Sequence, residues 1–433
     1  MASSSSRTER VELNTVEIFI SFQVGSIVVL DGHASIFGAP LRPNVRYRFR
    51  ERYLTVQAIG KVRLDINGDF SLRTPRALST DLQELETRFD LKRQNAQAAN
   101  KTGPVILLVG EKDTGKSTAC RTLANLALRS QSAIVVPHST APGTKTERDD
   151  QQVSTTKGIA FVDLDVGQGG ITCPGSMAST FLESTIPVDE DFQTMIPLVL
   201  FFGDKSVTQQ TRKRYLDLCS WTAQSIASVQ LAKPGFRSGG VIINTMGWVR
   251  ELGYDLLKQI ITMFDVTDIV VCGGNQTLFD GLSSDFSFAR DRIEFHTFQL
   301  SSTPSETAKT GLDRIQLRHT QLTSYFSGTL RTPLVPVRLV VYLKDVELID
   351  AVTLEDFNMK LLRPLTVAAV STAPQRELCA SANIAGFVII TDIGKKTLTL
   401  LSPAPGALPR PFLLVAPTFM AKPELIPPFG ASS

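Results

Sequence analysis

One junction in the sequence limits the possible folds of this chain more than any other feature. The apolar run "VILLV" (Val105 to Val109) has the composition of a buried strand, and the segment from Lys116 to Leu128 has the spacing of a helix. Residues 110–117, "GEKDTGKS", join the two and match the phosphate-loop pattern G-x-x-x-x-G-K-[ST]. A glycine-bearing turn between a buried strand and a helix predicts a nucleotide-binding site in an α/β fold.

The residue types in this loop suit a triphosphate and its metal ion. Glycine lets backbone N–H groups curl around the β-phosphate, and the helix that follows adds the positive end of its dipole. Lys116 supplies positive charge to the β- and γ-phosphates, and Ser117 offers a hydroxyl to Mg²⁺. We therefore expect ATP and Mg²⁺ as ligands; the alternative is a chance match in an ordinary turn. The candidate nucleotide-binding residues are Gly110, Glu111, Lys112, Asp113, Thr114, Gly115, Lys116, Ser117 and Thr118.

A second buried strand ends in carboxylates. In "IAFVDLDVGQGG", strand alternation places Asp163 and Asp165 on the same face, and Asp165 lies nearer the carboxyl end of the strand, where ligand sites of such sheets form. Asp165 is thus the predicted carboxylate near both the metal ion and the phosphate acceptor. The alternative role for Asp165 is to cap the glycine-rich turn that begins at Gly167.

The chain is long enough for several domains, because 433 residues exceed what one hydrophobic core normally supports. Short β segments with period-two alternation, such as "VRYRFR", precede residue 79; apolar runs then alternate with helical spacing to about residue 330, and strands return beyond it. We expect an α/β protein whose central phosphate-loop domain has a mostly parallel sheet. It would be flanked by an N-terminal β-sandwich and a C-terminal β-rich domain. The predicted ranges are 1–100 (with a linker helix), 101–330 and 331–433, with a disordered insertion at 137–158.

Composition excludes several classes of protein. The five cysteines are scattered and never spaced as Cys-x-x-Cys, and the four histidines share no metal-ligand spacing. No apolar run is long enough to span a membrane, so we expect no membrane partner. The net charge of +3 is mild, so any nucleic-acid surface must be local.

From residue 161 onward the sequence resembles a known family. The run "FVDLDVGQGGITCPG", about fifty residues after a phosphate loop, is similar to the eukaryotic polyribonucleotide 5′-hydroxyl kinases, and especially to the branch associated with pre-mRNA cleavage factor II. Matching stretches follow in order: "SGGVIINTMGWV", "SYFSG", "AGFVIITDI", and "LSPAPGALP" with "FLLV". Together with "IFG" near the N-terminus, they span all three expected domains.

The resemblance implies transfer of the γ-phosphoryl group of ATP to the 5′-hydroxyl of an RNA end. By similarity, Lys116 acts on the phosphates, Ser117 and Asp165 hold the metal ion, and Asp165 also activates the hydroxyl. Trp248 would stack on the terminal base, although a tryptophan beyond the strand "GVIIN" could equally belong to the core. The remaining implied residues are Gln168 and Lys309 for RNA binding, and Arg314 and Arg318 of a lid helix for catalysis.

Two departures from the family pattern bear on activity. Lys309 stands where the family usually has Arg, and Gln210 with Thr211 replaces the family's Thr-x-Asn-like clasp for RNA. The basic triplet 212–214 beside the clasp could bind phosphates or form a solvated helix face. Three hypotheses therefore remain: an active RNA 5′-kinase, an ATP-bound, non-catalytic scaffold of the mRNA 3′-end cleavage factor, or an ordinary phosphate-loop ATPase with no RNA partner. Under the first two, the resemblance implies cleavage-factor subunits as partners and a nuclear location.

Overall fold

The computed structural model describes the chain except for residues 1–6, 133–157, 193–194, 300–310 and 426–433. Two predictions concern residues in those ranges. The predicted insertion at 137–158, apart from Gly158, lies outside the described residues, and so does Lys309. No helix in the described ranges is long and apolar enough to cross a membrane.

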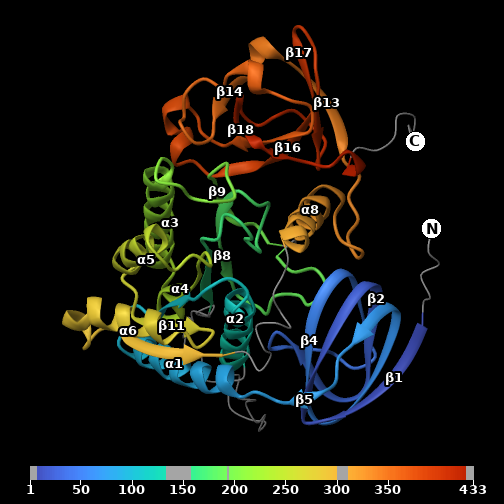
Figure 1. Cartoon of the computed structure of the whole chain (residues 1–433), viewed down its shortest axis with the longest axis vertical. Helices are drawn as coiled ribbons and strands as arrows, with labels where there is room; N and C mark the ends of the chain where they lie inside the picture. Colours follow the sequence, from blue (N-terminus) through green and yellow to red (C-terminus); the bar gives the residue numbers. More distant parts are fainter. Residues whose placement is uncertain (1–6, 133–157, 193–194, 300–310, 426–433) are drawn as a thin grey trace, which may run out of the picture.

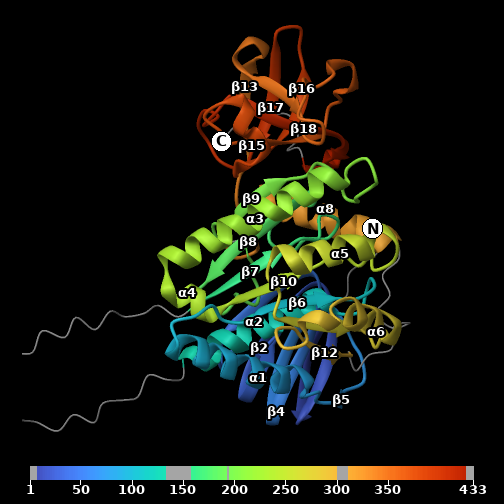
Figure 2. The same ribbon diagram turned by 90° about the vertical axis from the view of Figure 1, so that its left-hand side faces the viewer.

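Three sheets follow one another along the chain, and the central one lies between the other two (Figures 1 and 2). The predicted α/β fold class is confirmed: a mostly parallel sheet with helices stands at the centre, and β-rich units flank it. The domain limits themselves stay a prediction.

The N-terminal sheet contains two long strands instead of the many short ones that the sequence predicted. The second strand, β2, pairs antiparallel with two separate stretches of β4, so the sheet folds back on itself. Gly25 and Gly68 face each other at a bend, and a Cβ on Gly68 would lie 2.3 Å from the carbonyl oxygen of Val24. Glycine thus marks a bend within these strands, which is why the sequence predicts shorter segments than the structure contains. The elements are β1 (Arg7–Asn14), β2 (Val16–Ile36), β3 (Ala39–Pro40), β4 (Arg46–Leu72) and β5 (Arg76–Ala77).

The central sheet has the strand order β12-β11-β6-β10-β7-β8-β9. Neighbours from β12 to β7 are parallel, and β8 and β9 are added antiparallel. Parallel strands buried on both faces need apolar residues throughout, which explains the runs in the sequence. The strands are β6 (Val105–Val109), β7 (Ile159–Asp163), β8 (Ser176–Leu182), β9 (Leu198–Phe201), β10 (Val241–Asn244), β11 (Asp268–Cys272) and β12 (Glu294–Phe298).

Helices cover both faces of this sheet. Buried residues of α1 and α2 form a core against one face, and those of α3, α5 and α6 form a core against the other. The helices are α1 (Asp81–Ala98), which leads in from the N-terminal sheet, α2 (Lys116–Ser132), α3 (Arg212–Ala232), α4 (Pro234–Gly239), α5 (Leu252–Met263), α6 (Gln276–Asp285), the short η1 (Ser287–Ala289) and α8 (Gly311–Ser327).

The C-terminal sheet packs beside strand β9 of the central sheet. The side chain of Asn383 accepts a hydrogen bond from the backbone N–H of Val199 at 2.6 Å, and Arg214 donates to the carbonyl of Ala380 at 2.8 Å. Its strand order is β13-β17-β16-β15-β18-β14. The elements are β13 (Val337–Tyr342), η2 (Leu343–Asp345), β14 (Glu347–Asp350), η3 (Met359–Leu361), β15 (Thr366–Ser371), η4 (Arg376–Ala380), β16 (Ile384–Ile393), β17 (Thr397–Ser402), β18 (Phe412–Met420) and η5 (Pro423–Leu425).

Candidate active site

The phosphate loop connects β6 to α2 in the predicted position. Gly110 has φ of +154°, and a Cβ there would lie 2.6 Å from the carbonyl oxygen of Cys272 on the adjacent strand. Lys116 is buried, and its ammonium donates to the carbonyls of Gly110 at 2.8 Å and Glu111 at 2.6 Å. Burial lowers the pKa of Lys116, whereas nearby negative charge, including that of Asp165, acts in the opposite direction. The loop therefore keeps its cation in place through its own backbone.

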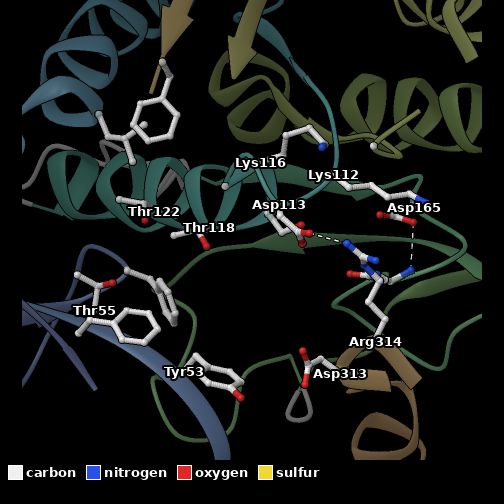
Figure 3. A pocket seen from close by; sticks show the side chains of 18 of the residues that line it. Tyr53, Thr55, Lys112, Asp113, Lys116, Thr118, Thr122, Asp165, Asp313 and Arg314 are labelled. Atoms are coloured by element: carbon white, nitrogen blue, oxygen red, sulfur yellow. Dashed lines mark hydrogen bonds and ion pairs between the residues drawn. The ribbon is translucent and has the colours of Figure 1, made fainter. Parts of the chain in front are cut away.

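A cavity of about 940 Å³ opens beside this loop (Figure 3). Its walls come from three parts of the chain: the loop and central sheet, the N-terminal sheet, and helix α8. Of the predicted nucleotide-binding residues, Lys112, Asp113, Gly115, Lys116, Ser117 and Thr118 line it. A cavity of this size can contain a nucleotide together with a reacting group.

A buried polar network leads from the loop to the neighbouring strands. The amide of Asn244, at the end of β10, donates to Ser117 Oγ at 3.3 Å and to Asp163 Oδ1 at 3.0 Å. Asp163 Oδ2 accepts from the backbone N–H of Gly170 at 2.6 Å. Burial, together with the charge of Asp165, raises the pKa of Asp163 to about 7.

We did not predict Asn244 as a site residue. It ends the buried strand "VIIN", which lies directly beside the phosphate-loop strand in the sheet. A polar residue at the carboxyl end of a buried parallel strand was the available signal, since ligand sites form at that edge.

The surroundings of Asp165 are consistent with both roles considered for it. Its Oδ1 accepts hydrogen bonds from the backbone N–H groups of Gly167 at 2.9 Å and Gln168 at 3.0 Å, so it does cap the glycine-rich turn. It also lines the cavity together with Gln168, and the positive charges of Lys116 and Lys112 act on it (Figure 3). Burial raises the pKa of Asp165, although these hydrogen bonds partly offset the effect. The cap holds the carboxylate in position and leaves Oδ2 without a hydrogen bond from the described residues.

Helix α8 brings its arginines to the cavity. A guanidinium nitrogen of Arg314 lies 2.5 Å from the carboxylate of Asp113 in the phosphate loop, and Arg318, one turn further on, also lines the cavity. Burial and the charge of Arg314 lower the pKa of Arg318. One turn beyond Arg318, the amide of Gln321 donates to the carbonyls of Gly169 and Thr172. The helix is thus tied to the turn that contains Asp165.

Trp248 lines the cavity as well, on the side of Lys112. Gly247 precedes it, and a Cβ at this glycine would lie within 2.8 Å of the backbone of Lys112, so only glycine lets the two segments pass. The indole is partly exposed and packs on its other side against the core under α5. Both interpretations of Trp248 therefore describe part of its surroundings.

The departures at the clasp turn out to lie beside the cavity. Gln210 and Thr211 do not line it, and Thr211 Oγ1 instead accepts a hydrogen bond from the backbone N–H of Thr208 at 2.8 Å. The cavity wall in this segment is made by residues 205–207, which we did not predict as site residues. Of the basic triplet, Arg214 is buried and binds the C-terminal sheet, so it is a structural residue.

The N-terminal sheet supplies the far wall, which nothing in the sequence indicated. Phe19 stacks on Tyr53 at a ring-centroid distance of 6.2 Å, and the guanidinium of Arg73 lies 4.8 Å from the Phe19 ring. These residues are about a hundred or more positions from Asp165 and join the cavity only through the docking of two sheets. The wall offers aromatic surface and positive charge.

A second group of polar side chains lies at the opposite end of the central sheet. Asp268, Glu294 and His296 place their ligand atoms within 4.8 Å of one another. The ammonium of Lys92, however, lies 2.7 Å from Asp268 and 2.9 Å from Glu294, and His296 Nε2 is 2.9 Å from Asp268. Burial works against ionisation of Asp268, but the hydrogen bonds from His296 and Lys92 outweigh it and lower the pKa. Lysine therefore takes the position that a metal ion would need.

Two family models match successive parts of the chain. Residues 150–328 match the family model described as mRNA cleavage and polyadenylation factor CLP1 P-loop, and residues 340–420 match the model described as pre-mRNA cleavage complex II protein Clp1. The first match begins after residue 117, so the phosphate loop is assigned from its own sequence and geometry.

Curated relatives match along nearly the whole chain. The polyribonucleotide 5′-hydroxyl-kinase Clp1 of Gallus gallus is 28% identical over 428 residues, which cover 91% of each chain. The protein of the same name from Macaca fascicularis is 29% identical over 422 residues, or 89% of each chain. The protein CLP1 homolog of Anopheles gambiae is 27% identical over 418 residues, covering 90% of this chain and 91% of the relative.

Two solved structures share the fold. A chain of the wild-type Clp1p–Pcf11p complex superimposes with a TM-score of 0.77 at 19% identity, covering 96% of this chain and 98% of that one. A second structure, of the interface between Pcf11p and Clp1p, gives 0.77 at 18% identity and covers 96% and 99%.

Proposed function

Because this chain belongs to the Clp1 family of mRNA cleavage and polyadenylation factors, we propose that it is an ATP-dependent polyribonucleotide 5′-hydroxyl kinase. One observation supports this most: Lys116, Asp165 and Arg314 converge on a single cavity from the phosphate loop, the turn after strand β7 and helix α8. Phosphoryl transfer needs such a combination of a phosphate cradle, an acceptor for the hydroxyl proton and positively charged side chains.

Each group has a role in transfer from ATP to a 5′-hydroxyl. Asp165 accepts the proton as the hydroxyl oxygen bonds to the γ-phosphorus and the bond to the β–γ bridging oxygen breaks, which leaves ADP. Arg314 and Arg318 stabilise the charge spread over the transferring oxygens, where fixed cations contribute most. Arg314 must leave Asp113 to do so.

The residues near Ser117 fit Mg²⁺. Ser117 Oγ, the carboxylate of Asp163 and the nearby Asp165 are oxygen donors, which this ion prefers, and they lie at the end of the loop where the β- and γ-phosphates would be. When bound, the ion would neutralise developing phosphate charge. Asn244 would hold the side chains of Ser117 and Asp163 in position for the ion, because its amide donates to both.

The acceptor RNA would enter on the side of Trp248. A base stacked on the indole would place the terminal ribose toward Asp165, since both line the same cavity. Lys205 and Gln168 also line the cavity and would supply polar contacts to the RNA. The opposite wall, with Phe19 and Tyr53, is left for the nucleoside part of ATP. RNA beyond its terminal nucleotides would leave the cavity along helix α8, which contacts β4 through Thr320 and Glu51.

Labelled phosphate transfer tests the proposal. The protein is incubated with γ-labelled ATP, Mg²⁺ and either a 5′-hydroxyl RNA or the same RNA with a 5′-phosphate. We expect label only in the first RNA, and none with Lys116→Ala, because that residue is the cation between the β- and γ-phosphates. Equal labelling of both RNAs would contradict 5′-hydroxyl transfer.

A second role in assembly is favoured by the solved relatives, which are complexes of Clp1p with Pcf11p. We propose that this chain likewise associates with subunits of the mRNA 3′-end cleavage factor, in the nucleus. If the bound nucleotide also supports assembly, Lys116→Ala weakens recovery of these subunits in a pull-down. Undiminished recovery without bound ATP would show that assembly does not use the nucleotide.

A further inference from the structure

Strand β4 carries a row of arginines outside the cavity. Arg46, Arg48 and Arg50 alternate along the strand with Tyr47 and the buried Phe49, so their side chains leave the same face of the sheet. All three are exposed, and no hydrogen bond or ion pair joins their side chains to another of the described residues. We call these residues the arginine row.

The row continues the strand that forms the cavity wall. Tyr53 and Thr55 of β4 line the cavity, and the row begins a few residues before them, beyond an irregularity at Glu51, which has φ of +49°. The carboxylate of Glu51 accepts a hydrogen bond from Thr320 of α8, so the row starts beside the lid helix. From there it leads away along the N-terminal sheet.

The stretch is an outer edge of its sheet. Residues 46–50 of β4 pair with β2 on one side, and no described strand pairs with them on the other. Two carboxylates lie on the other side of β2 from the arginine row. Asp65 is across β2 from Arg46, and Asp69 is across β2 from Arg50. The positive charge is therefore concentrated at the rim, and the negative charge lies behind it.

We propose that the arginine row binds the phosphate backbone of the acceptor RNA beyond its 5′ end. Residues on one face of a strand repeat about every 7 Å, so the long guanidinium side chains can contact successive backbone phosphates. The row holds three positive charges and has little apolar surface of its own, which suits a polyanion better than an apolar peptide. The inference rests on the proposed function, because that function makes RNA the acceptor.

Salt dependence of RNA binding gives a readout that does not need catalysis. For single strands, the slope of log K against log salt is about 0.7 per phosphate contact. The triple variant R46Q/R48Q/R50Q should therefore show a slope smaller by about 2 and bind an RNA of about 20 nucleotides on the order of tenfold more weakly. Fluorescence anisotropy between about 50 and 200 mM salt measures both quantities.

A matched control removes the same charge elsewhere. Arg290→Gln, Arg292→Gln and Lys396→Gln combined take three positive charges from exposed positions on other surfaces. This variant should keep the slope and the affinity of the parent protein. If both triple variants lose the same affinity, the effect is one of net charge and the proposed contact is wrong.

Acceptor length separates this inference from the proposed function. A dinucleotide acceptor cannot reach the row, so parent and R46Q/R48Q/R50Q should phosphorylate it at equal rates, while KM for the longer RNA rises on the order of tenfold. If the parent binds RNA through the row but transfers no phosphate, the proposed function fails and the inference stands. If transfer proceeds and the variant binds the longer RNA as tightly as the parent, the inference alone is overturned.

Charge on an edge strand can also prevent aggregation, and reversing the charge of the arginine row distinguishes this role from RNA binding. The variant R46E/R48E/R50E keeps the edge charged and soluble, yet should bind RNA more weakly than the glutamine variant. Unchanged RNA binding by the glutamate variant would overturn the proposal. A polyglutamate peptide tests for an acidic protein partner: if the row binds this peptide and RNA binding does not depend on the row, the row is a protein-docking site.

Discussion

Arg314 of the lid helix and Asp113 of the phosphate loop form an ion pair across the mouth of the cavity, with a nitrogen–oxygen distance of 2.5 Å. The arginine is the residue that we assign to the transferring phosphoryl group, and its present partner is a carboxylate of the loop that would hold the nucleotide. Asp113 and the γ-phosphate therefore compete for the same cation. The pair keeps the lid arginine close to the site before ATP arrives.

Asp113→Asn should strengthen ATP binding by about two- to fivefold, because ATP no longer has to displace the pair with Arg314. Titration of a fluorescent ATP analogue measures the change. Glu111→Gln is the matched control: it removes the same charge from the same loop but frees Arg250 instead of the lid. Equal effects of the two substitutions would mean that the loop charge matters and the pair does not.

Arg314→Ala and Arg318→Ala should each lower kcat by a factor on the order of 10² to 10⁴, while the affinity for ATP changes little. The reason is that the arginines bind the transferring oxygens most tightly in the transition state, while in the ground state a contact of Arg314 with ATP only replaces its ion pair with Asp113. Steady-state kinetics with a 5′-hydroxyl RNA and a parallel ATP titration measure the two quantities. Arg290→Ala, an exposed position outside the cavity, is the control and should leave kcat unchanged. Parental rates in the double lid variant would remove the lid from the mechanism.

Trp248→Ala should raise KM for RNA by about 10- to 100-fold, since stacking of a base on an aromatic ring contributes about 1–3 kcal/mol. Trp248→Phe keeps an aromatic surface and should recover most of the loss. Trp221, the other tryptophan of the chain, lies on α3 outside the cavity, and Trp221→Phe should leave KM unchanged. If Trp248→Ala lowers only the melting temperature and KM stays the same, the indole is a core residue.

Asp163 should make the stability of the magnesium-free protein depend on pH. An acid whose pKa is raised by folding, here to about 7, costs stability above its unfolded value, and the cost grows until the pH passes the folded value. Asp163→Asn removes this cost, so the variant should gain stability relative to the parent between about pH 5 and about pH 8. Urea unfolding at both ends of this range measures the difference. A difference that does not vary with pH would show that Asp163 is already ionised at the lower pH.

Local signals allowed the phosphate loop and its surrounding strands to be predicted from the sequence. The local sequence from Val105 to Ser117 specifies a strand, a turn and the start of a helix. No contact with a distant segment was needed to predict them. Asp163 and Asp165 were found for the same reason, because a buried apolar strand that ends in carboxylates is visible in a single stretch.

Other parts of the site depend on contacts between distant segments. Asn244 joins Ser117 only because β10 lies beside β6, and Tyr53 lines the cavity only because the N-terminal sheet docks against the central domain. The alternation in "VRYRFR" correctly predicted a half-buried strand, but not that Arg46 to Arg50 lie at a free edge. Strand order is a property of the whole sheet, and a period-two pattern contains no information about it.

The central claim is that this protein transfers phosphate to RNA 5′ ends, and single-turnover transfer by the parent and by Asp165→Asn tests it most directly. ATP binding is measured on the same samples. We expect the parent to move the γ-phosphate of ATP onto a 5′-hydroxyl RNA, and Asp165→Asn to bind ATP as the parent does but transfer about 10² to 10⁴ times more slowly. A parent protein that binds ATP and this RNA yet transfers no phosphate would contradict the claim and leave the role in assembly.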